Sequence, residues 1–202
     1  MRTSVFVGAS LDGFIARPDG TFDFLTAGSD GDGASNGFNE FFSTVDAVLM
    51  GRNTYEVVLP FPEWPYGLTP VFILTSRPLP PSPRGAVVEQ IAGAPAEVLS
   101  RLAGRGFEHV YVDGGVTIQQ FLRAGLVDRV VITRVPVLVG AGISLFGGVD
   151  SDIRLKHVAT RELPGGAVQS EYEIGVPAGA DPGGGQEVRG AGGPVRVRLR
   201  DG

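Results

Sequence analysis

Three short stretches of the chain combine the residue types that bind phosphate groups. They are Arg52-Asn53-Thr54, Thr75-Ser76-Arg77, and Gly114-Gly115 followed by Thr117, and each comes directly after a short apolar run typical of a β-strand. Arginine side chains supply charged forks, hydroxyl groups supply short donors, and a glycine turn ahead of a helix exposes backbone N–H groups. Together the three stretches predict a site for a ligand with several phosphates, such as a nucleotide cofactor.

Each stretch alone also has a simpler interpretation. Arg52 is compatible with a solvated surface residue, Thr54 with a helix cap, and Gly114-Gly115 with a tight turn between a strand and a helix. The spacing matches neither the G-x-G-x-x-G fingerprint of dinucleotide-binding folds nor the G-x-x-x-x-G-K-[ST] phosphate loop. The prediction of a nucleotide site therefore depends on the series of three and not on one motif.

The elements that would position these stretches alternate between strands and helices over the first 126 residues. The apolar patterns predict strands at 3–9, 46–50, 71–74, 87–88 and 109–112, and helices at 36–44, from 51–55 onward, at 95–102 and after Gly115. Strands alone follow at 127–137, 153–160 and 167–176, the last two joined by a Pro164-Gly165-Gly166 turn, and loops are expected at 21–34, 60–65 and 138–146. This order predicts an α/β fold whose central sheet is mostly parallel, with an antiparallel C-terminal hairpin and helices on both faces.

Composition excludes several classes of protein. The absence of cysteine excludes a disulfide scaffold, a cysteine nucleophile, a zinc–thiolate site and an iron–sulfur cluster. The 17 basic and 22 acidic side chains give no global field for nucleic acid, and no apolar run approaches membrane-spanning length. The two histidines, His109 and His157, are not in metal-like spacing, so no metal site is predicted. Because the N-terminus has the pattern of a first strand and not of a signal peptide, we expect a cytoplasmic protein.

Five segments, in this order, resemble the dihydrofolate reductase family. They are SLDGFIA (10–16), LMGRNTYE (49–56), ILTSRP (73–78), VDGGVTI (112–118) and PVLVGAGISLF (136–146). Within that family the chain is most similar to the C-terminal reductase domain of the bifunctional riboflavin-biosynthesis deaminase-reductase and to its stand-alone relatives. The resemblance covers residues 1–176 and implies the family's three-layer fold, whereas the Gly- and Pro-rich residues 177–202 are predicted to form a disordered tail. Of the motifs, G-R-x-T-[WY] with the later GG turn is fairly specific, and SLDG alone is not.

The resemblance implies that NADPH is the cofactor and assigns residues to its parts. The pyrophosphate and adenosine side would be held by Gly51, Arg52, Asn53 and Thr54, and the 2′-phosphate would face Thr75, Ser76 and Arg77. The diphosphate and nicotinamide ribose would be wrapped by Gly114, Gly115, Val116, Thr117 and Ile118, with a peptide bond between the two glycines that the family often has in the cis form. The nicotinamide would lie beside Ala9, Leu11, Asp12 and Ile15.

The implied activity is hydride transfer from NADPH to a small heteroaromatic or carbonyl substrate, of pterin, folate or pyrimidine type. Asp113 stands where the riboflavin branch has glutamate, just before the two glycines, and is expected to contact the substrate. Asp12 is a second candidate for orienting the substrate or passing a proton, with a turn role before Gly13 as its alternative. Asp23 is an approximate counterpart of the carboxylate that protonates a pterin in folate reductases, as is Glu40.

Two departures from the riboflavin branch narrow this expectation. The deaminase half is absent, because its zinc site needs cysteines that the chain lacks, and Phe6 stands where the riboflavin enzyme has a lysine on the first strand. The second departure argues against a phosphoribosyl substrate. A rival hypothesis is a non-catalytic module that keeps the nucleotide cleft. The expected partners are a small-molecule substrate and, because riboflavin-type relatives pair, a second copy of the chain in a homodimer.

Overall fold

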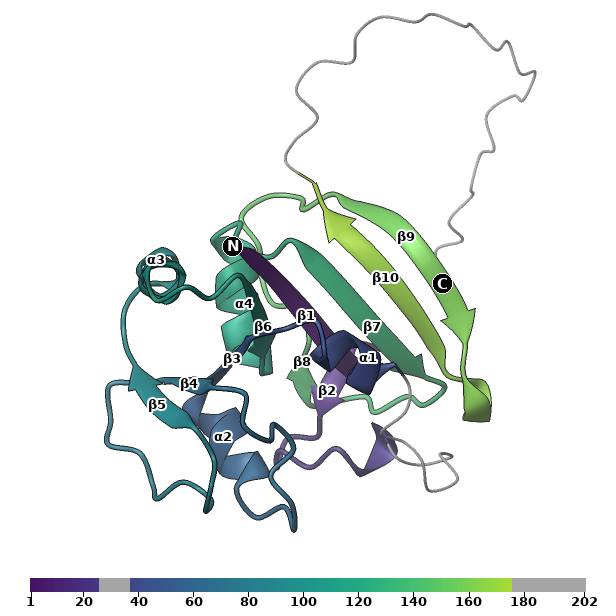
Figure 1. The fold of residues 1–202 in the computed structure, drawn as a ribbon. Helices are drawn as coiled ribbons and strands as arrows, with labels where there is room; N and C mark the ends of the chain where they lie inside the picture. The colour runs from purple at the N-terminus through teal and green to yellow at the C-terminus, as the bar shows by residue number, and fades with distance from the viewer. Residues whose placement is uncertain (26–36, 176–202) are drawn as a thin grey trace, which may run out of the picture.

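A single eight-stranded sheet forms the middle layer of the computed structural model, which describes residues 1–25 and 37–175 (Figure 1). Six neighbouring strands run parallel, and the last two pair in antiparallel fashion, the first of them with the edge of the parallel set and the second with the first. In spatial order the strands are β5 (Val88–Ile91), β4 (Val71–Leu74), β3 (Ala47–Gly51), β6 (His109–Asp113), β1 (Arg2–Ser10), β7 (Arg129–Val135), β10 (Val168–Ile174) and β9 (Leu155–Glu162). The predicted tail at 177–202 and most of the predicted loop at 21–34 lie outside the described residues.

Helices cover both faces of the parallel half of the sheet. Side chains of successive strand residues point to opposite faces, so a strand that is apolar throughout needs a covering layer on each side. Ala47 and Leu49 of β3 join the core beneath α3 (Pro95–Gly104) and α4 (Gly115–Arg123). Val48 and Met50 of the same strand join the core beneath α1 (Phe38–Phe42) and α2 (Arg52–Val58). The predicted three-layer α/β arrangement with a mostly parallel sheet and an antiparallel end is therefore confirmed.

A second, two-stranded sheet lies beside β1. It pairs β2 (Phe14–Ala16) with β8 (Ile143–Ser144), which falls inside the segment that we expected to be an irregular loop. With two residues, β8 is too short to produce a visible alternation of polar and apolar residues. Two short 3₁₀ turns, at Asp23–Leu25 and Pro164–Gly166, complete the described elements.

Candidate functional site

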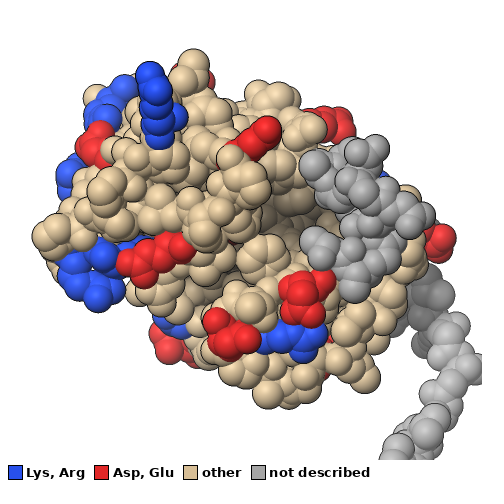
Figure 2. Space-filling model, turned by 90° about the horizontal axis from the view of Figure 1, so that it is seen from below, with Lys and Arg blue, Asp and Glu red and all other residues tan. Residues whose placement is uncertain are grey.

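A cavity of about 800 Å³ lies at the carboxyl ends of β4, β3, β6 and β1. It corresponds to the hollow in the face of the molecule shown in Figure 2, which looks onto this edge of the sheet. Parallel strands lie about 4.8 Å apart, so the three spacings from β4 to β1 give the cavity a length of about 14 Å. Ile15 of β2 and Ile143 of β8 close it from the other side. This is the edge of an open α/β sheet where ligands bind.

The turns that follow β3 and β6 fit into each other through glycine and threonine. A side chain at Gly114, whose φ is 89°, would overlap the side chain of Thr54, and a Cβ atom at Gly51 would lie 2.8 Å from the hydroxyl oxygen of Thr117. Each turn thus leaves room for a threonine of the other. The first turn of α4 begins directly at Gly115, so its unpaired N–H groups face the cavity, where an anion would be stabilised.

The peptide bond between Gly114 and Gly115 is trans, in contrast to the cis form expected from the family. Position 115 requires glycine for a separate reason, because a Cβ atom there would lie 2.8 Å from Cδ1 of Ile15. Glycine at this position therefore lets Ile15 pack directly against the backbone of the turn.

The two arginines of the cavity are engaged differently. Arg52 donates to the Glu56 carboxylate at 2.7 Å and to the Pro78 carbonyl oxygen at 2.6 Å. Its guanidinium group thereby holds the segment that follows β4. Arg77 lines the cavity, and within the described part of the chain its guanidinium group makes no recorded hydrogen bond or ion pair. Its backbone N–H donates to the Thr75 hydroxyl at 3.1 Å, which shapes the turn. Arg77 is thus the better placed of the two to bind an anion.

Asp113 ends β6 at the floor of the cavity. One carboxylate oxygen accepts the Gly114 N–H at 2.7 Å, and the other lies 3.4 Å from the hydroxyl oxygen of Tyr66. Tyr111 is a further neighbour, although in this structure its hydroxyl donates to the Phe6 carbonyl at 2.9 Å. Burial raises the pKa of the Asp113 carboxyl above its ordinary value of 3.8, against the lowering effect of these hydrogen bonds. The same burial, with the charge of Asp113, raises the pKa of both tyrosines.

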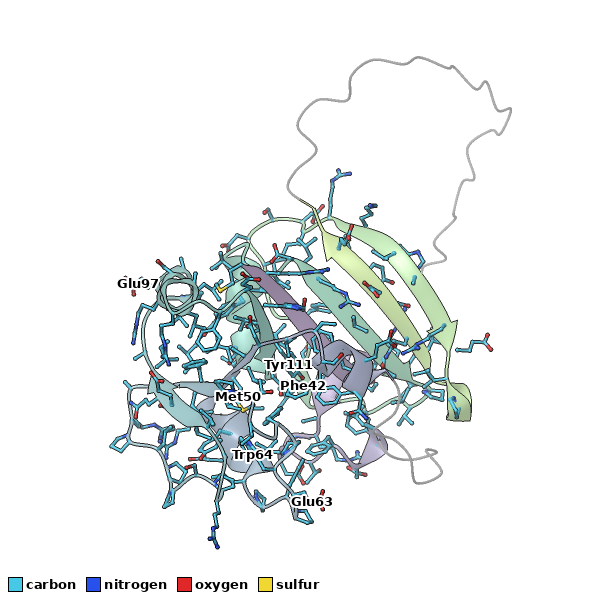
Figure 3. All side chains as sticks on the ribbon, in the orientation of Figure 1. Phe42, Met50, Glu63, Trp64, Glu97 and Tyr111 are labelled. Atoms are coloured by element: carbon cyan, nitrogen blue, oxygen red, sulfur yellow. The ribbon has the colours of Figure 1, made fainter. Side chains whose placement is uncertain are left out.

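Tyr111 connects this floor to a cluster of aromatic rings on the α1 and α2 side of the sheet. Figure 3 shows Tyr111 close to Phe42 and Met50, with Trp64 farther along the same side. The Trp64 ring contacts the Tyr66 ring with centroids 5.1 Å apart, so Trp64 supports the loop that brings Tyr66 to Asp113. Trp64 itself is not part of the cavity wall.

Asp12, expected beside the nicotinamide, lies outside the cavity wall. Its carboxylate accepts the Ser10 hydroxyl at 2.6 Å and the backbone N–H groups of Val139 and Gly140. The Ser10 hydroxyl, followed by the Gly140 N–H, lowers the pKa of Asp12 to about 2. Asp12 therefore holds the loop that precedes β8, which matches the turn role given as its alternative. Its neighbour Leu11 is 60% exposed and also lies outside the wall.

Asp23 also stands outside the wall and is engaged elsewhere. Its two carboxylate oxygens accept hydrogen bonds from Nε and one Nη of Arg17, at 2.7 and 3.0 Å. The Arg17 hydrogen bond is the main reason that the pKa of Asp23 is lowered. A carboxyl group held in its ionised form is poorly suited to donate a proton, so neither Asp12 nor Asp23 is retained as a catalytic candidate.

Most of the residues predicted to hold the cofactor lie in the cavity wall, and four do not. Those in the wall are Ile15, Gly51, Arg52, Asn53, Thr54, Thr75, Arg77, Gly114, Gly115, Val116 and Thr117. Ala9 and Ile118 instead belong to the core beneath it, and Leu11 and Ser76 are absent from the wall. The wall also contains apolar residues for which no wall position was predicted, namely Phe6, Val7, Gly8, Leu25, Val57 and Phe61. Alternation along 3–9 does not identify them, because the consecutive residues Phe6, Val7 and Gly8 all line the wall.

The described residues contain neither a metal-ligand cluster nor a membrane-spanning helix. No group of three or more His, Asp or Glu side chains there is arranged to hold a metal ion. None of the helices in those ranges is long and apolar enough to cross a membrane.

Comparison with known proteins identifies the family. Residues 4–168 match the model of the RibD C-terminal domain. The chain belongs to this family. Membership of this family confirms the resemblance to riboflavin-type reductase domains. It also supports the assignment of the chain to the oxidoreductases as a broad reaction class.

Two similar proteins cover nearly the whole of the described chain. YwjB of Bacillus subtilis, named as an uncharacterized protein, is 32% identical over 173 residues, which are 85% of this chain and 97% of YwjB. The crystal structure of a putative riboflavin biosynthesis protein from Shewanella sp. PV-4 is 36% identical, with a TM-score of 0.80 over 87% of this chain and 100% of that one.

More distant RibD-type and folate-reductase structures share the fold. The Thermotoga maritima diaminohydroxyphosphoribosylaminopyrimidine deaminase/5-amino-6-(5-phosphoribosylamino)uracil reductase has a TM-score of 0.67 and 19% identity, over 86% of this chain and 56% of that one. Dihydrofolate reductase from Enterococcus faecalis, complexed with NADP(H), has a TM-score of 0.56 and 16% identity, over 85% of this chain and 95% of that one.

Proposed function

We propose that the chain is an NADPH-dependent reductase that transfers hydride to a small planar heterocycle of pterin, folate or pyrimidine type. The observation that carries this proposal is the composition of the cavity from end to end. The β4 end offers Arg77 and the Thr75 hydroxyl, the middle offers the glycine turns with Asp113 at the end of β6, and the β1 end is mostly apolar. The RibD C-terminal domain family and the NADP(H) complex of a folate reductase with the same fold support the choice of cofactor.

The wall fits a nicotinamide dinucleotide at the glycine turns. Glycine at positions 51, 114 and 115 leaves room for Thr117, Thr54 and Ile15, so the two turns pack closely and their residues line the same wall. Asn53 and Thr54 would hold the pyrophosphate, Thr75 and Arg77 the 2′-phosphate, and residues 114–117 the diphosphate and nicotinamide ribose. When bound, the cofactor supplies the hydride.

The residue proposed to act on the substrate is Asp113. Reduction of a C=N or C=C bond of a heterocycle adds one hydride and one proton, and the proton must come from an acid near the acceptor atom. The raised pKa of the Asp113 carboxyl keeps more of it protonated than an ordinary aspartate would be. In either protonation state it also forms hydrogen bonds to an N–H or ring nitrogen of the substrate, which fixes the orientation of the ring.

Titration with NADPH and NADH, followed by fluorescence and melting temperature, tests the cofactor. We expect both to bind and NADPH to bind more tightly, with a higher melting temperature at saturation because ligand binds only the folded state. If neither perturbs the protein at millimolar concentration, the proposal fails.

Turnover separates a reductase from the rival, a nucleotide-binding module without catalysis. Pterins, folates and ribosylaminopyrimidines should be tested for NADPH oxidation, and we expect at least one to be reduced. NADPH binding without turnover on any member of the panel would favour the module.

A further inference from the structure

The ionisable groups of the large cavity are segregated along its length. The basic side chains in its described wall are Arg52 and Arg77, next to the ends of β3 and β4. The acidic ones are Asp113, at the end of β6, and Asp19, in the loop after β2. Arg52 is already paired with Glu56 at 2.7 Å. The end of the cavity near β1 therefore offers a negative or neutral surface to a ligand.

Phe6 forms the apolar wall at this end. Its ring stacks on Phe41 with centroids 5.0 Å apart and meets the edge of Phe38 at 5.6 Å, so it is packed from the α1 side. Its carbonyl oxygen accepts the Tyr111 hydroxyl at 2.9 Å, which ties the strand to the floor beside Asp113. Phe6 is thus fixed in place by neighbours on both sides.

Behind Phe6 lies a second cavity of about 290 Å³. Its wall includes Arg129 and Arg161, together with Glu40 and Glu171, and Arg129 donates to Glu171 at 2.6 Å. Phe6 is common to the described walls of both cavities. The phenylalanine ring therefore separates these arginines from the large cavity.

Within the described wall, a phosphorylated substrate would meet no cation at the β1 end. Arg17, which lies between the wall residues Ala16 and Pro18, is paired with Asp23. A buried or half-buried phosphate needs arginine, lysine or a set of N–H donors to replace its hydration, and a nearby carboxylate adds repulsion. The related Thermotoga maritima enzyme is named for a substrate, 5-amino-6-(5-phosphoribosylamino)uracil, that carries a phosphate.

We infer that the substrate of this chain is an uncharged planar heterocycle that donates N–H groups to Asp113 and carries no phosphate, and that Phe6 is the residue that imposes this limit. The inference rests on the proposed reductase function, because it assigns the substrate to the end of the cavity that NADPH leaves open. The inferred substrate lacks the phosphate that is present in 5-amino-6-(5-phosphoribosylamino)uracil, the compound for which the Thermotoga maritima enzyme is named.

A matched pair of ligands tests the inference. The pair is 5-amino-6-ribosylaminouracil with and without its 5-phosphate, added to the protein saturated with NADP⁺, and the dissociation constants are measured by calorimetry. We expect the phosphorylated compound to bind at least about tenfold more weakly, because its charge is left without a partner. Equal or tighter binding of the phosphorylated compound would overturn the inference, and so would failure of both compounds to bind a protein that has bound NADP⁺.

The binding readout keeps this test separate from that of the proposed function. Loss of all cofactor binding would refute the reductase, whereas a preference for phosphate in a cofactor-binding protein would refute only the substrate class. Substitution Phe6→Lys should reduce the discrimination against phosphate about tenfold by placing an ammonium group at the β1 end. Phe6→Leu is the matched control and should retain the discrimination. A single cooperative thermal unfolding transition in both variants shows that they fold.

Discussion

Asp113 is the residue on which the proposed chemistry depends most. The substitution Asp113→Asn keeps the size and most hydrogen bonds of the side chain but removes its proton. We expect kcat to fall about 10²- to 10⁴-fold, the usual contribution of a general acid, with the affinity for NADPH nearly unchanged. Asp23→Asn is the control, because that carboxylate lies outside the cavity wall, and its kcat should stay close to that of the wild type.

The role of Asp113 as proton donor also predicts the direction in which kcat changes with pH. If the protonated form of Asp113 donates, kcat of the wild type falls as pH rises through the pKa of this carboxyl, which burial places above 3.8. Asp113→Asn should lack that descending limb. An identical pH profile in the two proteins would contradict the role of proton donor.

Arg77 and Arg52 give opposite predictions although both line the cavity. Arg77→Ala should weaken NADPH binding about tenfold or more and NADH binding little, because a charge-assisted hydrogen bond to the 2′-phosphate is lost. Arg52→Ala should weaken both dinucleotides alike, because Arg52 holds the segment after β4 through the Pro78 carbonyl. Equal losses for the two cofactors in Arg77→Ala, measured by fluorescence titration, would refute its assignment.

At the scale of elements, the turns after β3 and β6 are held together by close contacts between glycine and threonine. Gly114→Ala should destabilise the fold by about 1–3 kcal/mol for the left-handed backbone and by a further 1–3 kcal/mol for the overlap with Thr54. Gly13→Ala is the matched control, since its φ of 86° is nearly the same and nothing lies within 4 Å of the added Cβ. Denaturant unfolding should therefore show a smaller loss for Gly13→Ala.

A double substitution identifies the steric part of that loss. Removing the side-chain hydroxyl and methyl groups with Thr54→Ala should restore part of the stability of Gly114→Ala. No recovery in the double variant would mean that the overlap with Thr54 is not the cause.

The elements could be predicted from sequence to different extents. The strands of the parallel sheet are apolar runs bounded by turn residues, so β3, β4 and β6 were placed within one or two residues. The pairing of β2 with β8 could not be predicted, because Phe14 and Ser144 are far apart in sequence and no local pattern connects them. For the same reason the contact of Asp12 with the Val139–Gly140 backbone, which is distant in sequence, could not be predicted, and Asp12 was placed beside the nicotinamide instead.

The site shows the same division between local and long-range information. The residues of the glycine turns lie next to strand ends and were placed correctly in the wall. The pairing of Arg52 with a carbonyl of residue 78, and of Tyr66 with Asp113, joins positions from different loops that no local pattern connects. The resemblance to a family supplied the order of the motifs but not these contacts.

At the scale of the whole molecule, the antiparallel end of the sheet contributes nothing to the described wall of the large cavity, whose last residue is Ile143. β9 is an edge strand, and all eight of its residues are exposed. Exposed strand edges are available for pairing with another chain, so we propose that this end of the sheet forms the interface of the expected homodimer.

Light scattering checks the dimer directly, with an expected mass of two chains. Val158→Asp on β9 should shift the mass toward one chain by placing a charge in the interface. Val149→Asp is the control, because Val149 is equally exposed, at 46%, but lies outside β9. A wild-type mass of one chain would remove the proposal.

The mutual fit of Gly51 with Thr117 and of Gly114 with Thr54 has a consequence for how the family changes over evolution. Because each glycine makes room for one particular threonine, the members of a pair are not free to vary independently. A lineage that acquires a side chain at position 114 would need a smaller residue at position 54 at nearly the same time. We therefore expect correlated substitutions at these two pairs of positions, even though each pair spans 60 residues or more of sequence.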